Sequence, residues 1–206
     1  MKKRLILVAA PPAHGKNYVS GLLCRALGCV SYLDKDDLAP LLSRAFALSG
    51  EDFDMDGGFY RENLRAAEYE TLMTLAFSAL TYTDTVLVNA PLSREVRNFG
   101  YMQALKARAN ARDAHLIVVW VEASDDACRA RMEKRAAKRD AGKLLDFDAY
   151  RARIDASVPT ELTDRGAVDM LIRFDNENEK TAAASLEAAI KAIDNLQYAK
   201  KGLQND

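Results

Sequence analysis

The stretch Leu5–Leu23, LILVAAPPAHGKNYVSGLL, decides the fold that we predict for this chain. Residues 5–10 form a continuous apolar run, which is typical of a strand that is covered on both faces of a parallel sheet. A short loop containing proline and glycine follows, and from Lys16 onward apolar residues recur at spacings of three and four. The sequence therefore predicts a buried strand, a short loop and an amphipathic helix in direct succession.

The same succession of strand and helix continues along the rest of the chain. Further continuous apolar runs predict buried strands, and the segments between them repeat apolar residues at helical spacing. Strands that alternate with helices indicate a layered α/β fold with a parallel sheet and right-handed crossovers. The predicted strands are Arg4–Ala10, Cys29–Leu33, Thr85–Asn89, His115–Val121 and Val168–Phe174, and the predicted helices are Lys16–Leu27, Asp36–Leu48, Phe59–Tyr82, Arg97–Asn110, Ser124–Arg139 and Asn178–Gln197.

Length and composition place the chain among ordinary globular proteins. Its 206 residues, against a soft prior of ~150 residues per domain, predict a single domain. The 29 basic and 30 acidic residues give a net charge of −1, which argues against a broad nucleic-acid surface. Three cysteines are too few for a disulfide framework, and no apolar run approaches the length of about 18 residues that a membrane span needs. We therefore expect a cytoplasmic protein with no membrane partner.

Residues 10–17, Ala-Pro-Pro-Ala-His-Gly-Lys-Asn, follow the phosphate-binding pattern G-x-x-x-x-G-K-[ST] with two departures. Backbone N–H groups at a helix start attract anions, the lysine adds a full charge, and the glycine lets the backbone approach a ligand. Ala10 replaces the first glycine, and Asn17 replaces the hydroxyl residue that would ligate Mg²⁺. The alternative is a structural helix start without a ligand. The candidate phosphate-binding residues are Pro12, Ala13, His14, Gly15, Lys16, Asn17 and Tyr18.

This loop and three later motifs, in the same order of elements, make the chain resemble the P-loop kinase-like branch of the P-loop NTPases. The later motifs are YLDKDDL, TVLVNAPLSREVRN and VEASDDACRARMEKRAAKRDAGKLLDFDAY. The resemblance extends to shikimate, adenylate and chloramphenicol kinases. It implies a three-layer α/β/α P-loop NTPase fold with a five-stranded parallel sheet in the order 2-3-1-4-5. It also implies ATP and Mg²⁺ as cofactors, and a lid at about residues 131–148 within one domain of residues 1–206.

The second motif ends a predicted strand with an acid, Asp34, at the position that faces the acceptor substrate in the kinases that the chain resembles. A carboxylate there can accept the proton of an attacking hydroxyl group or hold that group in line with the γ-phosphate. Asp36 is a weaker candidate for the same contact. The alternative for both is that they cap the next helix.

The third motif has Asn89 where the family commonly has an acid that holds a Mg²⁺-bound water. Asn17 and Asn89 depart from the family at the same metal site, so either Mg²⁺ is held mainly by phosphates, water and Asp34 or Asp36, or catalysis is feeble. Asn17 and Asp34 are the candidate metal ligands. Arg94 and Arg97 follow this strand and are candidates to contact the acceptor, the alternative being solvated arginines at a helix start.

The fourth motif repeats arginine at every fourth residue, which places Arg131, Arg135 and Arg139 on one face of a helix that Gly142 interrupts. By the resemblance this is the lid, in which Arg131 takes the adenine base and Arg135, with Arg139, takes phosphate. The alternative is a solvated basic face paired with nearby acids. After the last strand, Asn176 is a candidate to bind the base, with a plain turn as the alternative.

The function that these residues favour is ATP-dependent phosphoryl transfer to a hydroxyl group of a small molecule. Lys16, Asp34 and Arg135 are the candidate catalytic residues. Two alternatives stay open: a nucleotide-binding sensor or regulator with little or no turnover, which the two asparagines favour, and a toxin-type or RNA-end kinase. The acceptor, the base preference between ATP and GTP, and the oligomeric state are not determined by the sequence.

Overall fold

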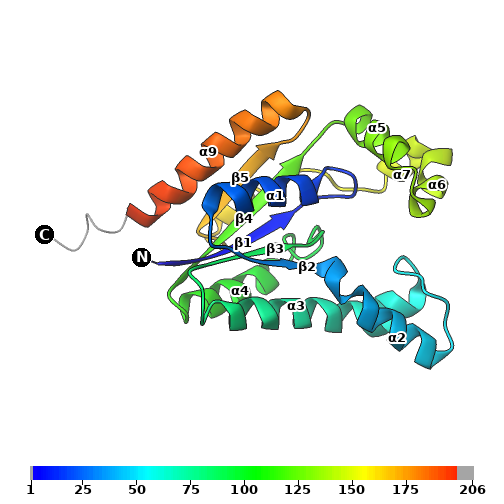
Figure 1. Ribbon diagram of the computed structural model, residues 1–206, viewed down its shortest axis with the longest axis horizontal. Coiled ribbons are helices and arrows are strands. Elements are labelled where there is room, and N and C mark those ends of the chain that lie inside the picture. The colour runs from blue at the N-terminus through cyan, green and yellow to red at the C-terminus, as the bar shows by residue number, and fades with distance from the viewer. Residues whose placement is uncertain (1, 199–206) are drawn as a thin grey trace, which may run out of the picture.

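The computed structural model describes residues 2–198, with residues 138, 139, 197 and 198 described by their backbone alone. Five strands form one parallel sheet in the order β2-β3-β1-β4-β5 (Figure 1), which confirms the predicted fold class and strand order. The strands are β1 (Lys3–Ala9), β2 (Ser31–Asp34), β3 (Thr85–Asn89), β4 (Ala114–Glu122) and β5 (Met170–Asp175).

Helices cover both faces of the sheet, and the side chains of β1 show how the two cores divide. Leu5 and Leu7 enter the core under α3 (Arg65–Ala79) and α4 (Phe99–Asn110), whereas Ile6 and Val8 enter the core under α1 (Lys16–Leu27) and α9 (Glu179–Tyr198). Successive residues of a strand point to opposite faces, so a continuous apolar run serves both cores. Trp120 is completely buried in the first core.

Two arms project from the sheet at the carboxyl ends of its strands (Figure 1). The α2–η2 arm contains the 3₁₀ helix η1 (Lys35–Leu38), α2 (Ala39–Ser49) and the π-helical segment η2 (Tyr60–Leu64). The α5–α7 arm contains α5 (Asp125–Arg135), α6 (Lys138–Leu145) and α7 (Phe147–Arg151), and the short α8 (Glu161–Asp164) precedes β5. No helix in residues 2–198 is long and apolar enough to cross a membrane.

The α5–α7 arm corrects two predictions. The helix expected over Ser124–Arg139 ends at Arg135, because Ala136 adopts a left-handed conformation with φ of 47°. Arg139 therefore lies in α6 and not on the face that carries Arg131. Gly142 does not interrupt a helix; it lies inside α6. A glycine costs a helix only about 1 kcal/mol relative to alanine, and that is not enough to end one that is held by its neighbours.

Candidate active site

The register of the sheet brings the ends of three strands together. Asn89, the last residue of β3, is the partner of Asp34 on one side and of Val8 on the other. The P-loop, residues 10–17, starts directly after β1, and its Ala10 N–H donates to the carbonyl of Pro91 at 3.2 Å. The carboxyl ends of parallel strands meet at one edge, and this edge is where ligands bind in such sheets.

The P-loop ends in a left-handed turn that leaves the start of α1 open. Gly15 is the N-cap of α1 with φ of 85°, and no side chain caps the helix. The first turn of α1 contains no acid. Uncapped N–H groups at a helix start, together with the helix dipole, favour an anion. Pro12 and Tyr18 are exposed around this turn, and Ala13, half-buried, has φ of 68°.

His14 does not present its ring to this open turn. Its side chain is buried, with Nδ1 3.0 Å from the carbonyl oxygen of Pro12 and 3.7 Å from Sγ of Cys128. Burial lowers the pKa of His14. The ring therefore supports the loop from inside, which differs from the phosphate contact that we expected.

Asn89 is the centre of a polar network that joins the P-loop to β2. Its Oδ1 accepts from Nζ of Lys16 and from Oγ of Ser20, each at 3.3 Å. Its Nδ2 lies 3.0 Å from Oδ1 of Asn17, 3.0 Å from the hydroxyl oxygen of Tyr32 and 2.7 Å from Oδ2 of Asp34. The opposite orientation of this amide would place its N–H groups against the ammonium of Lys16 and its oxygen against a carboxylate, so the neighbours fix the orientation.

Asp34 is held as a carboxylate. Oδ2 accepts from the hydroxyl of Tyr32 at 2.6 Å, and Oδ1 accepts from the backbone N–H of Asp36 at 3.0 Å. Partial burial opposes ionisation, but the hydrogen bonds from Tyr32, Asp36 and Asn89 outweigh it and lower the pKa of Asp34. Burial and the bond to Asp34 raise the pKa of Tyr32, so the phenol keeps its proton. Asp34 thus also caps η1, as the alternative prediction has it.

The side chains around Asn89 do not fit a magnesium site. Mg²⁺ prefers several oxygen ligands in octahedral geometry. The two candidate ligand oxygens, Oδ1 of Asn17 and Oδ2 of Asp34, both already accept from Nδ2 of Asn89. The N–H groups of Asn89 are thus directed at both oxygens, where they oppose a cation. Within the described part of the chain, no cluster of three or more His, Cys, Asp or Glu residues is suited to hold a metal.

Arg131 and Arg135 of the α5–α7 arm are both engaged with other groups of the protein. Arg131 donates to the carbonyl groups of His14, Asn176 and Glu177. Arg135 forms a two-point ion pair with the buried Asp140, at 2.8 Å from Nε and 2.6 Å from Nη2.

Three other residues that we predicted for the site, Arg139, Asn176 and Asp36, lie in different surroundings. The side chain of Arg139 lies outside the described residues. Asn176 is buried and donates to the His14 carbonyl at 2.7 Å. Asp36 is exposed and lies 3.6 Å from the ammonium of Lys35.

Arg94 and Arg97 have separate surroundings. Arg97 contacts the carboxylate of Asp155 at 3.1 Å and the carbonyl of Ser157 at 2.7 Å, and its guanidinium lies over the ring of Trp120. Arg94 is exposed and lines a cavity of about 490 Å³ between α3 and α4. The structure therefore brings Lys16, Asn17 and Asp34 together at Asn89, but not these two arginines.

A buried ion pair supports the strand end that carries Asp34. Nζ of Lys35 lies 3.0 Å from Oε1 of Glu68 on α3, and both side chains are buried. The hydroxyl of Tyr60 donates to the other carboxylate oxygen of Glu68. These contacts fasten η1 and η2 to α3, so the polypeptide that follows Asp34 is anchored.

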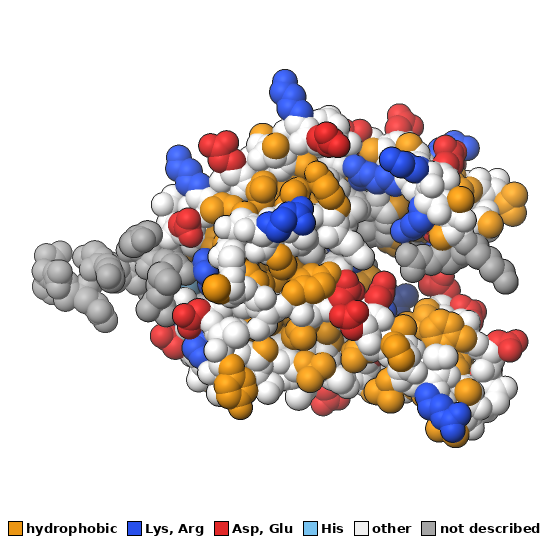
Figure 2. Space-filling view, in the orientation of Figure 1, with side chains coloured by type: hydrophobic (Ala, Val, Ile, Leu, Met, Phe, Trp, Pro, Cys, Tyr) orange, Lys and Arg blue, Asp and Glu red, His pale blue; other side chains and the backbone are white. Residues whose placement is uncertain are grey.

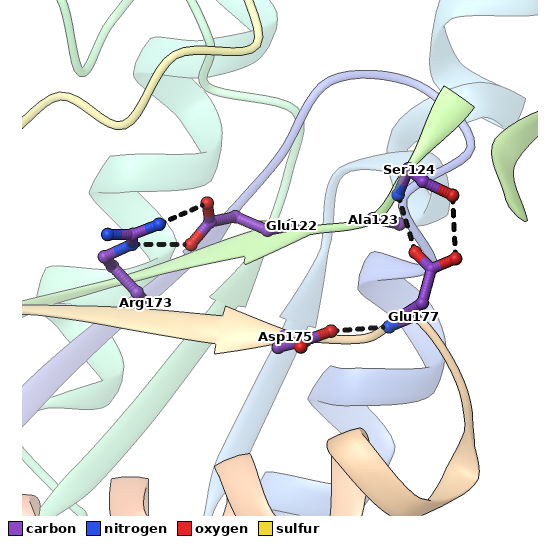
Figure 3. Close-up of a pocket in the computed structure, with 6 residues that line it drawn as sticks. All are labelled: Glu122, Ala123, Ser124, Arg173, Asp175 and Glu177. Carbon is purple, nitrogen blue, oxygen red and sulfur yellow. Dashed lines mark hydrogen bonds and ion pairs between the residues drawn. The ribbon is translucent and has the colours of Figure 1, made fainter. Parts of the chain in front are cut away.

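Two further hollows lie at the carboxyl ends of the strands. Figure 2 shows a hollow between the α2–η2 arm and the α5–α7 arm. A second cavity, of about 350 Å³, lies at the ends of β4 and β5 (Figure 3). Its three carboxylates all have partners: Glu122 pairs with Arg173, Glu177 accepts from the N–H and hydroxyl groups of Ser124, and Asp175 accepts from the N–H of Glu177.

Tyr32 and Ser20 belong to the network, and the sequence analysis missed both. Tyr32 lies two residues before Asp34 on β2, so the two side chains leave the strand on the same face. That spacing is a signal which could have identified the tyrosine. Ser20 lies one helical turn after Lys16, which places the two on the same face of α1.

The comparisons with known proteins agree with this architecture. A family model described as an AAA domain matches residues 5–157. No curated protein matches the chain. A solved structure from Chloroflexus aurantiacus j-10-fl, whose description as a kinase is provisional, is 20% identical with a TM-score of 0.66, covering 95% of this chain and 98% of that chain.

Two further solved structures are similar. A gluconokinase from Sinorhizobium meliloti 1021 is 14% identical with a TM-score of 0.56, covering 97% of this chain and 98% of that chain. The Mycobacterium tuberculosis APS kinase in complex with AMPPNP and APS is 18% identical with a TM-score of 0.51, covering 96% and 99%. At these identities the likeness shows the fold, which is that of the P-loop kinases.

Proposed function

The chain belongs to the AAA domain family, and from this premise we propose that it is an ATP-dependent phosphotransferase that acts on a hydroxyl group of a small molecule. One observation carries the proposal. The ammonium of Lys16 and the carboxylate of Asp34 contact opposite ends of one amide, that of Asn89. A cation for the phosphates and a carboxylate for the acceptor thus lie on either side of a single side chain.

Each of these groups has a role in the proposed transfer. The uncapped N–H groups of α1 and Lys16 hold the β- and γ-phosphates of ATP. Asp34, held ionised, accepts the hydrogen bond of the acceptor hydroxyl and takes its proton as the new P–O bond forms and the bond to the leaving ADP breaks. Oδ2 of Asp34 already accepts two hydrogen bonds, from Tyr32 and Asn89, whereas Oδ1 accepts one, from Asp36, so the acceptor hydroxyl is assigned to Oδ1.

The remaining proposals concern the α5–α7 arm. We propose that residues 131–148 act as a lid over the hollow between the two arms. Arg135 exchanges its ion pair with Asp140 for the transferring phosphoryl group when nucleotide binds. A closed lid excludes water and so limits hydrolysis of ATP.

A small-molecule acceptor is favoured by the named relatives. A gluconokinase and an APS kinase share the fold over nearly the full length of this chain. The net charge of −1 is a poor match for a polynucleotide acceptor.

The proposal is tested by a phosphotransfer screen. The full chain is mixed with ATP and a panel of sugars, nucleosides, antibiotics and hydroxy acids, and the phosphorylated products are detected by mass spectrometry. We expect one chemical class to be phosphorylated, and Asp34→Asn to abolish the product. ATP consumption that no acceptor increases would contradict the proposal.

A second candidate is a nucleotide-binding regulator with little turnover. It is favoured by Asn89, whose N–H groups are directed at the two oxygens that would otherwise serve a metal. This candidate predicts that ATP binds equally well with Mg²⁺ and with a chelator, and that no acceptor is phosphorylated. An ATP affinity that depends strongly on Mg²⁺ would argue against it.

A further inference from the structure

Two side chains from outside the P-loop bind the backbone of its fifth residue. Nδ2 of Asn176 donates to the carbonyl oxygen of His14 at 2.7 Å, and Nη1 of Arg131 donates to the same oxygen at 3.4 Å. Asn176 lies directly after β5 and is buried. Both side chains donate to protein backbone here, and the contacts with adenine that we predicted for them stay predictions.

Arg131 also connects the loop after β5 to this point. Its Nη2 donates to the carbonyl of Asn176 and, at 3.3 Å, to that of Glu177. The carboxylate of Glu177 in turn accepts from the N–H and the hydroxyl of Ser124, each at 2.7 Å (Figure 3). One set of hydrogen bonds therefore joins the P-loop, the turn before α5, the helix α5 and the loop after β5.

Asn176 and Arg131 also lie close to Gly15, the glycine of the P-loop. A Cβ atom added to Gly15 would overlap Nδ2 of Asn176 and would also approach Nη1 of Arg131 to 3.8 Å. Gly15 therefore serves two purposes here. Its φ of 85° suits a residue without a side chain, and its missing Cβ leaves room for the Asn176 amide.

The geometry of a peptide unit shows what this set of bonds does. The C=O of His14 and the N–H of Gly15 belong to one trans peptide, so they point in opposite directions. A carbonyl that is held by Asn176 and Arg131 directs the Gly15 N–H away from them. We propose that Asn176 and Arg131 are positioning residues which clamp the His14 carbonyl and so hold the P-loop amides ready for phosphate.

The clamp also ties the arm to the loop. Arg131 is on α5, so a movement of this helix changes the hold on His14. The position of the α5–α7 arm and the shape of the P-loop are thereby linked through Arg131, in addition to the contact between the His14 ring and Cys128. The link to ATP rests on the proposed function, whereas the clamp itself does not.

A double-mutant cycle tests the clamp without any ligand. Gly15→Ala, Asn176→Ala and the double variant are compared with the original chain by thermal denaturation. We expect Gly15→Ala to lower the Tm, and to lower it less when Asn176 is already alanine, because the overlap is then absent while the strain at positive φ persists. Equal losses in both backgrounds would overturn the contact.

Amide exchange provides a second measurement, should Gly15→Ala fail to fold. The Val19 N–H donates to the carbonyl of Gly15 at 3.1 Å and so reports on the turn. We expect Asn176→Ala to speed its exchange by tenfold or more, on the order of the loss of one buried hydrogen bond. Asn178→Ala is the matched control, since the Asn178 side chain accepts from the N–H groups of Lys180 and Thr181 at the start of α9. Unchanged exchange in Asn176→Ala would overturn the clamp.

Titration with ATP then separates the clamp from the proposed function. We expect Asn176→Ala to bind ATP about tenfold more weakly and Asn178→Ala to bind as the original chain does. An original chain that binds no ATP would contradict the proposed function, while the melting cycle would still decide the clamp. An Asn176→Ala variant with full ATP affinity would overturn the positioning role.

Discussion

Asn89 is the residue on which the candidate site depends most. A neutral amide carries both a donor and an acceptor end, so it can face a lysine ammonium and an aspartate carboxylate at once. Here its oxygen faces Lys16 and its nitrogen faces Asp34. An aspartate at this position would lie beside Asp34 and repel it. The departure from the family pattern at Asn89 is therefore consistent with the charges around it.

Asp34→Asn is predicted to separate chemistry from nucleotide binding. The carboxylate is lost, so phosphoryl transfer should fall by about 100-fold or more, the usual effect of removing a general base. ATP affinity should change little, because Asp34 is assigned to the acceptor. Steady-state kinetics and calorimetry measure the two effects.

Asp37→Asn is the matched control for this experiment, because Asp37 lies exposed on the same 3₁₀ helix as Asp36 and Lys35. It should retain full activity. If Asp34→Asn kept full activity as well, Asp34 would have no part in the transfer.

A titration is predicted at Glu177. The hydrogen bonds from the N–H and the hydroxyl of Ser124 lower the pKa of Glu177. Because this pKa is lower in the folded state than in the unfolded state, the stabilisation that the contact provides is fully present above the unfolded value of about 4.3. It is lost as the pH falls through the lower pKa of the folded state. The amide resonance of Ser124 in NMR spectra should therefore move with a midpoint below the ordinary pKa of a glutamate side chain.

Two variants make this titration specific. Glu177→Gln should remove the movement of the Ser124 resonance, because no carboxylate is left to protonate. Glu179→Gln, at the exposed first position of α9, should leave it in place. A midpoint at or above the ordinary glutamate value would be inconsistent with the bonds drawn in Figure 3.

Among the secondary-structure elements, α5 shows how a helix end was missed. Its arginines recur every four residues without a break, and the pattern alone predicts a helix through Arg139. The turn at Ala136 is marked by no glycine, proline or asparagine. An alanine at a left-handed C-cap gives no signal in the sequence, because the residue itself prefers to continue the helix.

Replacing Ala136 by glycine is predicted to stabilise the protein. The left-handed conformation at φ of 47° costs a residue with a Cβ roughly 1 kcal/mol and costs glycine little. Ala136→Gly should raise the Tm by about 1–3 °C. Ala137→Gly, at φ of −77°, is the control and should lower it slightly. A lower Tm for Ala136→Gly would mean that this turn is not left-handed.

Other elements were predicted closely where periodicity and burial agreed. The strand Thr85–Asn89 and the helix Lys16–Leu27 have the predicted bounds, since both lie against the cores that their apolar residues build. The helices expected over Asp36–Leu48 and Phe59–Tyr82 each begin with a different turn, the 3₁₀ helix η1 and the π segment η2. These turns hold Lys35 and Tyr60 on Glu68, a long-range contact that local periodicity does not reveal.

At the scale of the molecule, the strand order decides which residues meet. β2 and β1 both pair with β3, so Asp34, Asn89 and the start of the P-loop converge although they are far apart in the sequence. The resemblance supplied this order, and with it the convergence of Lys16, Asn17 and Asp34. The inward turn of His14 and the backbone contacts of Arg131 and Asn176 depend on packing between distant segments. A family pattern therefore could not reveal them.

Among the described side chains, one ion pair joins the two arms, and we predict that the distance between the arms depends on salt. Nζ of Lys143 on α6 lies 3.5 Å from Oδ2 of Asp56, which precedes η2. The pair is partly exposed, so it is worth at most about 1 kcal/mol and weakens with salt. Energy transfer between dyes on α2 and α6 should report a longer distance in Lys143→Ala, and the original chain should lengthen similarly in about 1 M salt.

Two controls test the pairing itself. Lys134→Ala, an exposed lysine on α5, should not change the distance between the dyes. The swapped variant Lys143→Asp with Asp56→Lys should restore the short distance, because the charges again attract. A distance that is the same in Lys143→Ala and in the original chain would show that the pair does not hold the arms.

The central claim is that residues 10–17 cradle a polyphosphate, and a calorimetric titration of ATP tests it most directly. The original chain should bind one ATP, and Lys16→Ala should bind at least tenfold more weakly, a loss on the order of 1.4 kcal/mol from missing charge-assisted contacts. Arg25→Ala, in the last turn of the same helix, should bind as the original chain does. Equal ATP affinity in the original chain and in Lys16→Ala would contradict the account.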